Sequence, residues 1–180
     1  LDNFPHQMSG GMRQRAMIAL ALACKPAVLL ADEPTTALDA TVQIQILLLL
    51  RELQREFGMS VIFVTHDIGV AIEVCDRVAV MYAGQIVETG TLRDIVRHAV
   101  HPYPRGLLTS TVHGARRGER LDTIPGTPPS LDVAPVSCAF APRCRFAEAV
   151  CGERLPPAVE VAPEHVARCV LAQKQAAAAS

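Results

Sequence analysis

Two adjacent carboxylates follow a short apolar run near the start of the chain. Asp32 and Glu33 come directly after Val28–Ala31, and such a run is typical of a strand buried on both faces. In open parallel sheets, ligands bind outside the carboxyl ends of the strands. Asp32 is therefore a candidate ligand of Mg²⁺, a cation that prefers oxygen, and Glu33 could orient or deprotonate a water molecule. Two surface acids that end a strand are the alternative interpretation of this pair by itself.

A histidine follows a second apolar run in the same way. His66 comes shortly after Val61–Val64. Two parallel strands would bring its imidazole to the same edge of the sheet as Glu33. An imidazole at this place can hydrogen-bond a phosphate oxygen. Taken alone, His66 is explained as well by a cap on the helix that begins near Asp67.

A third candidate is the run Ser9 to Gly11, just before a predicted helix. The hydroxyl, the free backbone N–H groups and the positive end of the helix dipole suit the binding of an anion. The glycines let a phosphate approach the backbone closely. An ordinary N-cap with a flexible lead-in is the alternative for this run in isolation.

Together these features resemble the ATPase domains of ABC transporters. Met8–Arg15 resembles their signature motif, and Val28–Glu33 resembles the Walker B strand with its catalytic glutamate. Thr36–Asp39 resembles the D-loop, and Val64–Asp67 resembles the H-loop. The order and spacing match the second half of such a domain, over residues 1 to about 92.

The resemblance implies that one group of residues serves the opposite subunit of a dimer. Ser9, Gly10 and Gly11 would contact the γ-phosphate of ATP held by that subunit. Asp39 would communicate across the dimer. Met12 departs from the Gln that commonly ends the signature, and it cannot donate an amide hydrogen bond.

The resemblance also implies the catalytic roles and the cofactors, ATP and Mg²⁺. Asp32 would bind Mg²⁺, Glu33 would activate the attacking water, and His66 would contact the γ-phosphate. The Gly-x-x-x-x-Gly-Lys-Ser/Thr loop that grips phosphates does not occur here, and neither Lys25 nor Lys174 has that context. We therefore expect a fragment of a longer ATPase, inactive in isolation, whose phosphate loop, adenine-stacking loop and Q-loop lie upstream.

Beyond residue 92 the resemblance narrows to one group of importers. His101–Leu108 resembles the His-Pro-Tyr segment that opens the C-terminal extension of oligopeptide and dipeptide importer ATPases, which nickel importers share. A proline-rich loop with an aromatic anchor is the alternative. We expect the ATPase part at 1–91, the extension at 92–172 and a disordered tail at 173–180.

Four of the six cysteines gather in the extension: Cys138, Cys144, Cys151 and Cys169. In a cytosolic protein this grouping is more typical of metal binding than of disulfides. Tetrahedral sulfur suits zinc or an iron–sulfur cluster. The five residues between Cys138 and Cys144, and the six between Cys144 and Cys151, make wider gaps than those of a zinc ribbon. The resemblance implies a [4Fe–4S] cluster, with zinc or a metal-free, structural segment as alternatives.

The elements that would position these residues alternate between helix and strand, which predicts an α/β fold. We expect helices at about 12–24, 40–57, 67–75 and from Thr91, strands at 28–31 and 61–64, and a hairpin of 78–82 with 85–88. Asp39 and Gly58 suit the two ends of the second helix. The predicted fold is thus the C-terminal half of an ABC-type P-loop ATPase domain. A small irregular extension follows, with a linker or loose packing at 101–135.

Composition limits the class of partner. The 17 Lys and Arg against 18 Asp and Glu give a formal net charge of −1, which argues against nucleic acid. The longest apolar run, Ala16–Cys24, is far shorter than the roughly 20 residues that span a membrane.

The resemblance therefore implies a cytoplasmic subunit, peripheral on the inner face of the cell membrane, that couples ATP hydrolysis to peptide uptake. Its expected partners are a second ATPase subunit, identical or paralogous, and transmembrane permease subunits. A periplasmic or extracellular substrate-binding protein would act with it indirectly. The alternative is a regulatory or metal-binding module that has lost catalysis.

Overall fold

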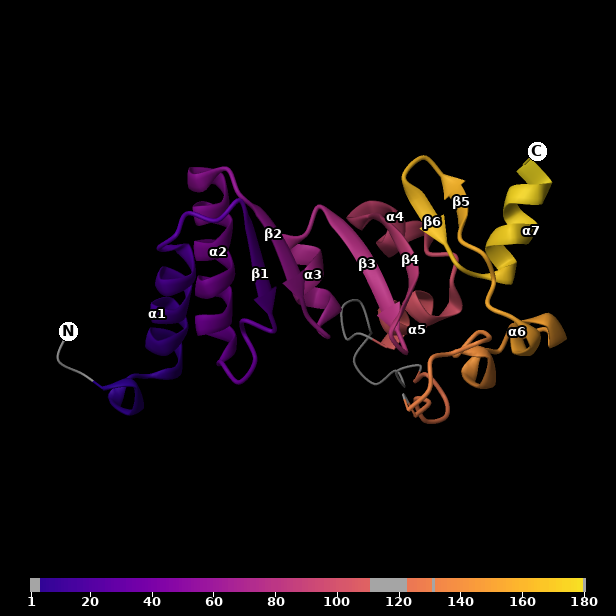
Figure 1. The fold of residues 1–180 in the computed structure, drawn as a ribbon, viewed down its shortest axis with the longest axis horizontal. Coiled ribbons are helices and arrows are strands. Elements are labelled where there is room, and N and C mark those ends of the chain that lie inside the picture. The colour runs from indigo at the N-terminus through magenta and orange to yellow at the C-terminus, as the bar shows by residue number, and fades with distance from the viewer. Residues whose placement is uncertain (1–3, 111–122, 131, 180) are drawn as a thin grey trace, which may run out of the picture. The chain divides into compact units, whose positions relative to one another are not determined.

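The computed structural model describes residues 4–110, 123–130 and 132–179, which belong to two compact units (Figure 1). The first unit is Leu1–Val74 and the second is Cys75–Ser180. Across the described residues, no helix combines the length and the apolar character needed to cross a bilayer. The expected boundary after residue 91 differs from this division, because the hairpin that precedes it packs with the extension.

The first unit is built on two parallel strands. A 3-10 turn, Pro5–Gln7, is followed by α1 (Gly10–Leu22), β1 (Val28–Asp32), α2 (Ala40–Phe57), β2 (Ser60–Val64) and α3 (Ile68–Val74). β1 and β2 pair in parallel, with Val28 opposite Ser60 and Asp32 opposite Val64. The alternation of helix and strand therefore gives the expected α/β arrangement.

Helices α1 and α2 pack against one face of this strand pair. The core joins Ile18 of α1, Leu29 of β1 and Ile46 of α2. On the other face Leu30 is 72% exposed and Ile62 is 54% exposed. The expectation of strands buried on both faces is thus wrong for the described residues, because this core covers one face only.

The helix ends follow the local sequence signals. The Asp39 carboxylate accepts the N–H of Val42 at 3.0 Å at the start of α2, and Gly58 ends that helix at φ 61°. α1 begins two residues earlier than expected, because the Ser9 hydroxyl accepts the N–H of Met12 and Gly10 joins the first turn.

The second unit contains an antiparallel sheet with the strand order β3-β4-β6-β5. Its elements are β3 (Arg77–Tyr82), β4 (Gln85–Thr91), α4 (Leu92–His98), α5 (Pro102–Ser110), a 3-10 turn (Ala141–Arg143), α6 (Ala149–Glu153), β5 (Val159–Ala162), β6 (His165–Ala167) and α7 (Val170–Ala179). The expected hairpin is present, and Ala83 and Gly84 both take positive φ in its tight turn.

The extension is more regular than expected. β6 pairs with β4 and β5 pairs with β6, so the extension adds two strands to the sheet. The segment expected to be a linker begins with α5. Pro102 is tolerated in its first turn, because a backbone N–H there would have no acceptor within the helix. Residues 111–122 of that linker lie outside the described part of the chain. Residues 173–179 of the expected disordered tail are helical in α7, and Ser180 also lies outside the described part.

A buried carboxylate connects the parts of this unit. Glu88 of β4 is 1% exposed. Its two oxygens accept the N–H of Val100 at 2.8 Å and the N–H of His101 at 2.7 Å. One of them also lies 2.7 Å from Nε2 of His165 in β6. Glu88 therefore links two strands to the junction between α4 and α5.

We predict that Glu88→Gln destabilises the second unit by about 3 kcal/mol. The NH₂ group of the new amide would face an N–H group that now donates to the carboxylate, so a buried donor would be left without an acceptor. The matched control is Glu160→Gln on β5, an exposed site expected to change stability by less than about 0.5 kcal/mol. Both tyrosines, Tyr82 and Tyr103, lie in the second unit, so their fluorescence during urea unfolding reports on it. A loss below about 1 kcal/mol in Glu88→Gln would contradict the role of this carboxylate.

Candidate functional site

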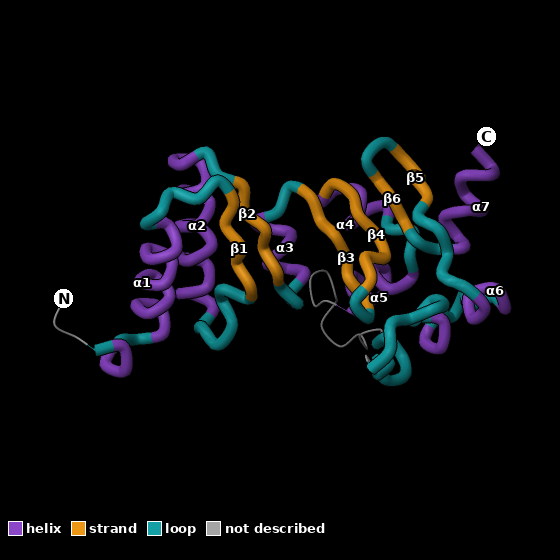
Figure 2. Tube along the Cα trace, viewed as in Figure 1, coloured by secondary structure: helices purple, strands orange, loops and turns teal. Residues whose placement is uncertain are grey.

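The candidate catalytic residues lie at one end of the first unit. Figure 1 shows that β1 and β2 both end there, and that α1 and α2 both begin there. In Figure 2 the segments that leave the two strands at this end are loops. Asp32 is the last residue of β1, and the N–H of Glu33 donates to the carbonyl of Val64 at 2.9 Å.

Glu33 and His66 are hydrogen-bonded to each other. Nδ1 of His66 lies 2.9 Å from Oε1 of Glu33, and the Thr36 hydroxyl donates to Oε2 at 2.8 Å. The hydrogen bond from His66, and then that from Thr36, holds the pKa of Glu33 below its ordinary value. Glu33 is therefore an ionised hydrogen-bond acceptor at neutral pH. The strand pattern correctly predicted that these two side chains share one edge.

The backbone turns sharply at Glu33. Its φ is 44°, a left-handed conformation that costs a non-glycine residue roughly 1–2 kcal/mol. The N–H of Thr36 donates to the Glu33 carbonyl at 3.1 Å and closes the turn. This conformation directs the Glu33 side chain out of the strand and toward the loop that carries His66. Strain of this kind is often found at functional sites.

Gly10 and Gly11 meet the start of α2. A Cβ atom at Gly10 would lie 3.1 Å from Cδ2 of Leu38, and one at Gly11 would lie 2.7 Å from Cγ1 of Val42. A side chain at Gly11 would therefore clash with Val42, whereas one at Gly10 would need only a small shift of the Leu38 side chain. The sequence indicated only that glycine lets a phosphate come close, because the contact with α2 is not local.

Asp39 and Ser9 both act as helix caps in this structure. One carboxylate oxygen of Asp39 accepts the Val42 N–H, and the Ser9 hydroxyl accepts the Met12 N–H at 3.3 Å. Leu38 of the D-loop lies against Gly10 of the signature, so the two motifs are adjacent. Met12, which follows Gly11 in α1, is 45% exposed.

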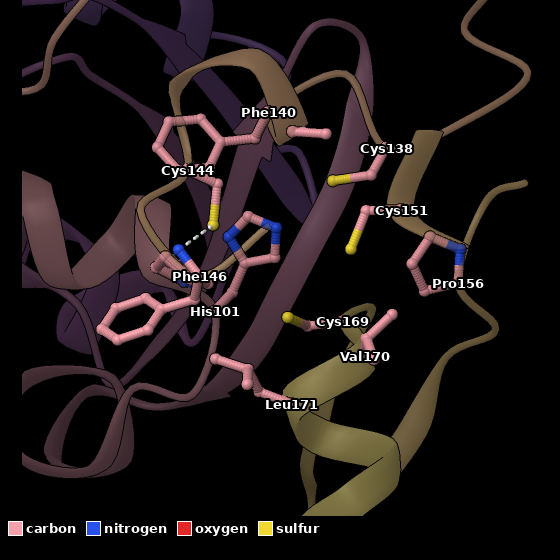
Figure 3. A pocket seen from close by; sticks show the side chains of 12 residues that line it. His101, Cys138, Phe140, Cys144, Phe146, Cys151, Pro156, Cys169, Val170 and Leu171 are labelled. Atoms are coloured by element: carbon pink, nitrogen blue, oxygen red, sulfur yellow. Dashed lines mark hydrogen bonds between the residues drawn. The ribbon is translucent and has the colours of Figure 1, made fainter. Parts of the chain in front are cut away.

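The four clustered cysteines line one small cavity in the second unit (Figure 3). They are Cys138, Cys144, Cys151 and Cys169, and each is a free thiol. Cys151 belongs to α6, and Cys169 directly precedes α7. The cavity encloses about 20 Å³, which is room for one water-sized group. The expected gathering of these four side chains is found.

The surroundings of the cavity disfavour the thiolate form of three of the four cysteines. Burial raises the pKa of Cys138, Cys144 and Cys169, and neighbouring cysteines of the group raise it further. A bound metal cation would reverse this by stabilising thiolates. Sulfur is a donor type that suits zinc or an iron–sulfur cluster, and binding either would require these thiols to lose their protons.

The distances do not fit a single ion. Within the described ranges, no three His, Cys, Asp or Glu side chains lie close enough to hold one metal ion. Zinc needs its sulfur ligands about 2.3 Å away, so the four thiols would have to move closer together. An iron–sulfur cluster is larger than one ion, so the cavity would have to widen around it.

His101 is a further residue of this cavity, and no sequence pattern predicted a chemical role for it. Its ring is 1% exposed, and burial lowers its pKa to about 4, so the imidazole is neutral near pH 7. Nδ1 accepts the N–H of Tyr103 at 3.1 Å. The local signal was weak, because the cysteines that face His101 come from distant parts of the sequence.

Two family models match different parts of this chain. The model described as "Oligopeptide/dipeptide transporter, C-terminal region" matches residues 87–151. The model described as "ABC transporter" matches residues 1–36. The first match includes three of the four clustered cysteines and the second includes the signature run, so the two models cover both candidate sites in part.

Curated relatives match almost the whole chain. A putative peptide import ATP-binding protein of Brucella ovis is 52% identical over an alignment 180 positions long, which covers 97% of this chain and 53% of the relative. A probable peptide ABC transporter ATP-binding protein of Sinorhizobium fredii is 55% identical over 171 residues, 94% of this chain and 51% of the relative. The oligopeptide transport ATP-binding protein OppD of Escherichia coli is 51% identical over 166 residues, 92% of this chain and 49% of the relative.

The chain thus spans about half the length of the curated relatives it matches. Its two matching family models and its identity to these relatives agree with each other and with the motifs of the first unit. The chain belongs to the family of ATP-binding subunits of oligopeptide/dipeptide-type ABC transporters, as a C-terminal part of such a subunit.

Proposed function

We propose that this chain is part of the ATPase subunit of an importer that couples ATP hydrolysis to the uptake of peptides. The observation that carries the proposal is the Glu33–His66 pair at the ends of two parallel strands, next to Asp32. Relatives named for peptide import support peptides as the transported class. Nickel is a second candidate substrate, because nickel importers share the His-Pro-Tyr segment.

In the proposed reaction Glu33 accepts a hydrogen bond from the attacking water and withdraws its proton. Its ionised state and its fixed orientation suit this role. His66 holds the carboxylate and contacts the γ-phosphate. Asp32, an exposed carboxylate at the end of β1, has the oxygen donors that Mg²⁺ prefers. When bound, Mg²⁺ neutralises charge on the phosphates.

The signature residues are proposed to serve a second subunit. α1 has 13 residues, and its N-terminal N–H groups with Ser9, Gly10 and Gly11 can bind the phosphates of ATP held by the opposite ATPase. Asp39, which caps α2 beside them, is proposed to transmit the state of one site to the other. The ATPase pair would lie in the cytoplasm, on the inner face of the cell membrane, beneath permease subunits. A substrate-binding protein would deliver the peptide to those permeases, and nucleic acid would take no part.

The cysteine cavity is proposed to hold a [4Fe–4S] cluster. Four sulfur donors that line one largely apolar cavity support this proposal, and the four thiols would have to move closer together to hold either a cluster or zinc. The cluster would join α6, α7 and the segment that contains Cys138, and so order the extension. Its role would be structural, because ATP hydrolysis requires no electron transfer.

We predict that Glu33→Gln in the full-length protein keeps ATP binding but lowers turnover about 10²–10⁴-fold, since the amide cannot accept a proton. The control is Glu52→Gln at an exposed site on α2, which should leave turnover unchanged. Steady-state phosphate release and nucleotide binding are measured on the same preparations. If Glu33→Gln kept more than about half of wild-type turnover, Glu33 would not be the general base.

We predict that the full-length protein, purified without oxygen, contains iron and inorganic sulfide, and that Cys169→Ser loses both. Cys24→Ser is the control, because Cys24 is exposed and lies outside the group. Iron, sulfide and zinc are assayed chemically, together with the number of free thiols. If the protein contained zinc but no iron, the cluster proposal would be wrong and the cysteines would form a zinc site. Absence of all three, with four titratable thiols, would defeat the metal proposal.

A further inference from the structure

We propose that Thr36 is a positioning residue for ATP hydrolysis: its hydroxyl fixes the carboxylate of Glu33 and makes the orientation of that carboxylate depend on the D-loop. The proposal rests on the function proposed above, in which Glu33 withdraws a proton from the attacking water. It gives the first residue of the D-loop a role in the site of its own subunit, whereas Asp39 is proposed to act across the dimer.

The first observation is that the two oxygens of the Glu33 side chain have different partners. Nδ1 of His66 lies 2.9 Å from Oε1, and the Thr36 hydroxyl donates to Oε2 at 2.8 Å. A carboxylate held at one oxygen can still rotate about the last bond of its side chain, while contacts at both oxygens fix its plane. Each oxygen has two lone pairs, so Glu33 can still accept a hydrogen bond from water.

The second observation is that Thr36 is joined to Glu33 twice. Besides the hydroxyl contact, the backbone N–H of Thr36 donates to the Glu33 carbonyl at 3.1 Å and closes the turn after β1. Glu33 and Ala37 both have left-handed backbone conformations, with φ of 44° and 63°. Such conformations are uncommon for residues other than glycine, so the path of this segment is specific and the hydroxyl contact depends on it.

The third observation is where this turn leads in the loop between β1 and α2 (Figure 2). The backbone N–H of Leu38, two residues beyond Thr36, donates to the carbonyl of Thr35 at 3.3 Å. A Cβ atom at Gly10 would lie 3.1 Å from Cδ2 of Leu38, so the same short segment contacts the signature. Thr36 thus lies between the carboxylate of Glu33 and the residue that touches the signature. A shift of the D-loop against the signature would move the hydroxyl relative to that carboxylate.

The exposure of Thr36 separates this role from packing. Thr36 is exposed, whereas the neighbouring Thr35 is 8% exposed. Valine in place of Thr36 exchanges the hydroxyl for a methyl group of similar size, so the donor is removed and the shape is kept. At an exposed position this exchange should have little effect on folding. A loss of activity would then come from the freed carboxylate.

The test is ATP turnover by the full-length protein as wild type, Thr36→Val, Thr36→Ala and Thr36→Ser. We expect both variants without a hydroxyl to lower kcat about tenfold with little change in KM, because the contact orients the base and does not bind ATP. Thr36→Ser keeps a hydroxyl that can reach Oε2 and should retain more than about half of wild-type kcat. Thr41→Val, at an exposed site on α2, is the same chemical change and should leave turnover unchanged.

A second measurement asks whether Thr36 acts through Glu33. Thr36→Val is combined with Glu33→Gln, and the residual turnover of the double variant is compared with that of Glu33→Gln alone. We expect no further loss, because two changes that act through the same group are not additive.

The proposal would be overturned by wild-type kcat in both variants without a hydroxyl, or by an equal loss in Thr36→Ser and Thr36→Val. A further loss of about tenfold in the double variant would also overturn it, because Thr36 would then act independently of Glu33. Wild-type turnover in Glu33→Gln is a different result, because it would reject the function proposed for Glu33 itself.

Discussion

The second unit depends on one buried carboxylate. A charge in a protein interior costs several kcal/mol unless it is paired and hydrogen-bonded, and Glu88 meets this condition with three partners. These partners belong to β6 and to the junction between α4 and α5, so satisfying Glu88 fixes where both segments lie. The same bonds hold the backbone of His101, whose ring forms part of the cysteine cavity. Space beside the Glu88–His165 pair is also limited, since a Cβ atom at Gly90 would lie 3.2 Å from the His165 ring.

The first unit uses a different principle. Two parallel strands end together, and the loops that follow carry the groups proposed for catalysis. The rigid elements set the positions of the loops, while hydrogen bonds from Thr36 and His66 set the orientation of Glu33. The glycines of the signature have two functions in this arrangement. They allow α1 to approach α2, and they leave the backbone open to an anion.

The sequence predicted features that depend on local patterns. Apolar runs that end in acids or histidine predicted the edge shared by Glu33 and His66, and the cap signals of Asp39 and Gly58 predicted the ends of α2. Features that depend on distant contacts were not predicted. β6 is only three residues long and has no clear period, so its pairing with β4 could be found only in three dimensions. The role of Glu88 and the position of His101 depend on the same long-range pairing. Whether one or both faces of β1 are buried depends on which other elements pack against the strand, and the local run of apolar residues does not show this.

ATP turnover by dimers with two substitutions tests most directly whether Ser9 and Glu33 serve different nucleotides. Ser9→Glu is combined with a substitution of the lysine in the phosphate-binding loop of the full-length protein, either in the same subunit or in opposing subunits. With both changes in one subunit, each composite site lacks one half and turnover should vanish. With the changes in opposing subunits, one site keeps both halves and turnover should persist. Equal loss in the two arrangements, in dimers whose composition is verified by mass, would contradict a signature that acts on the nucleotide of the partner.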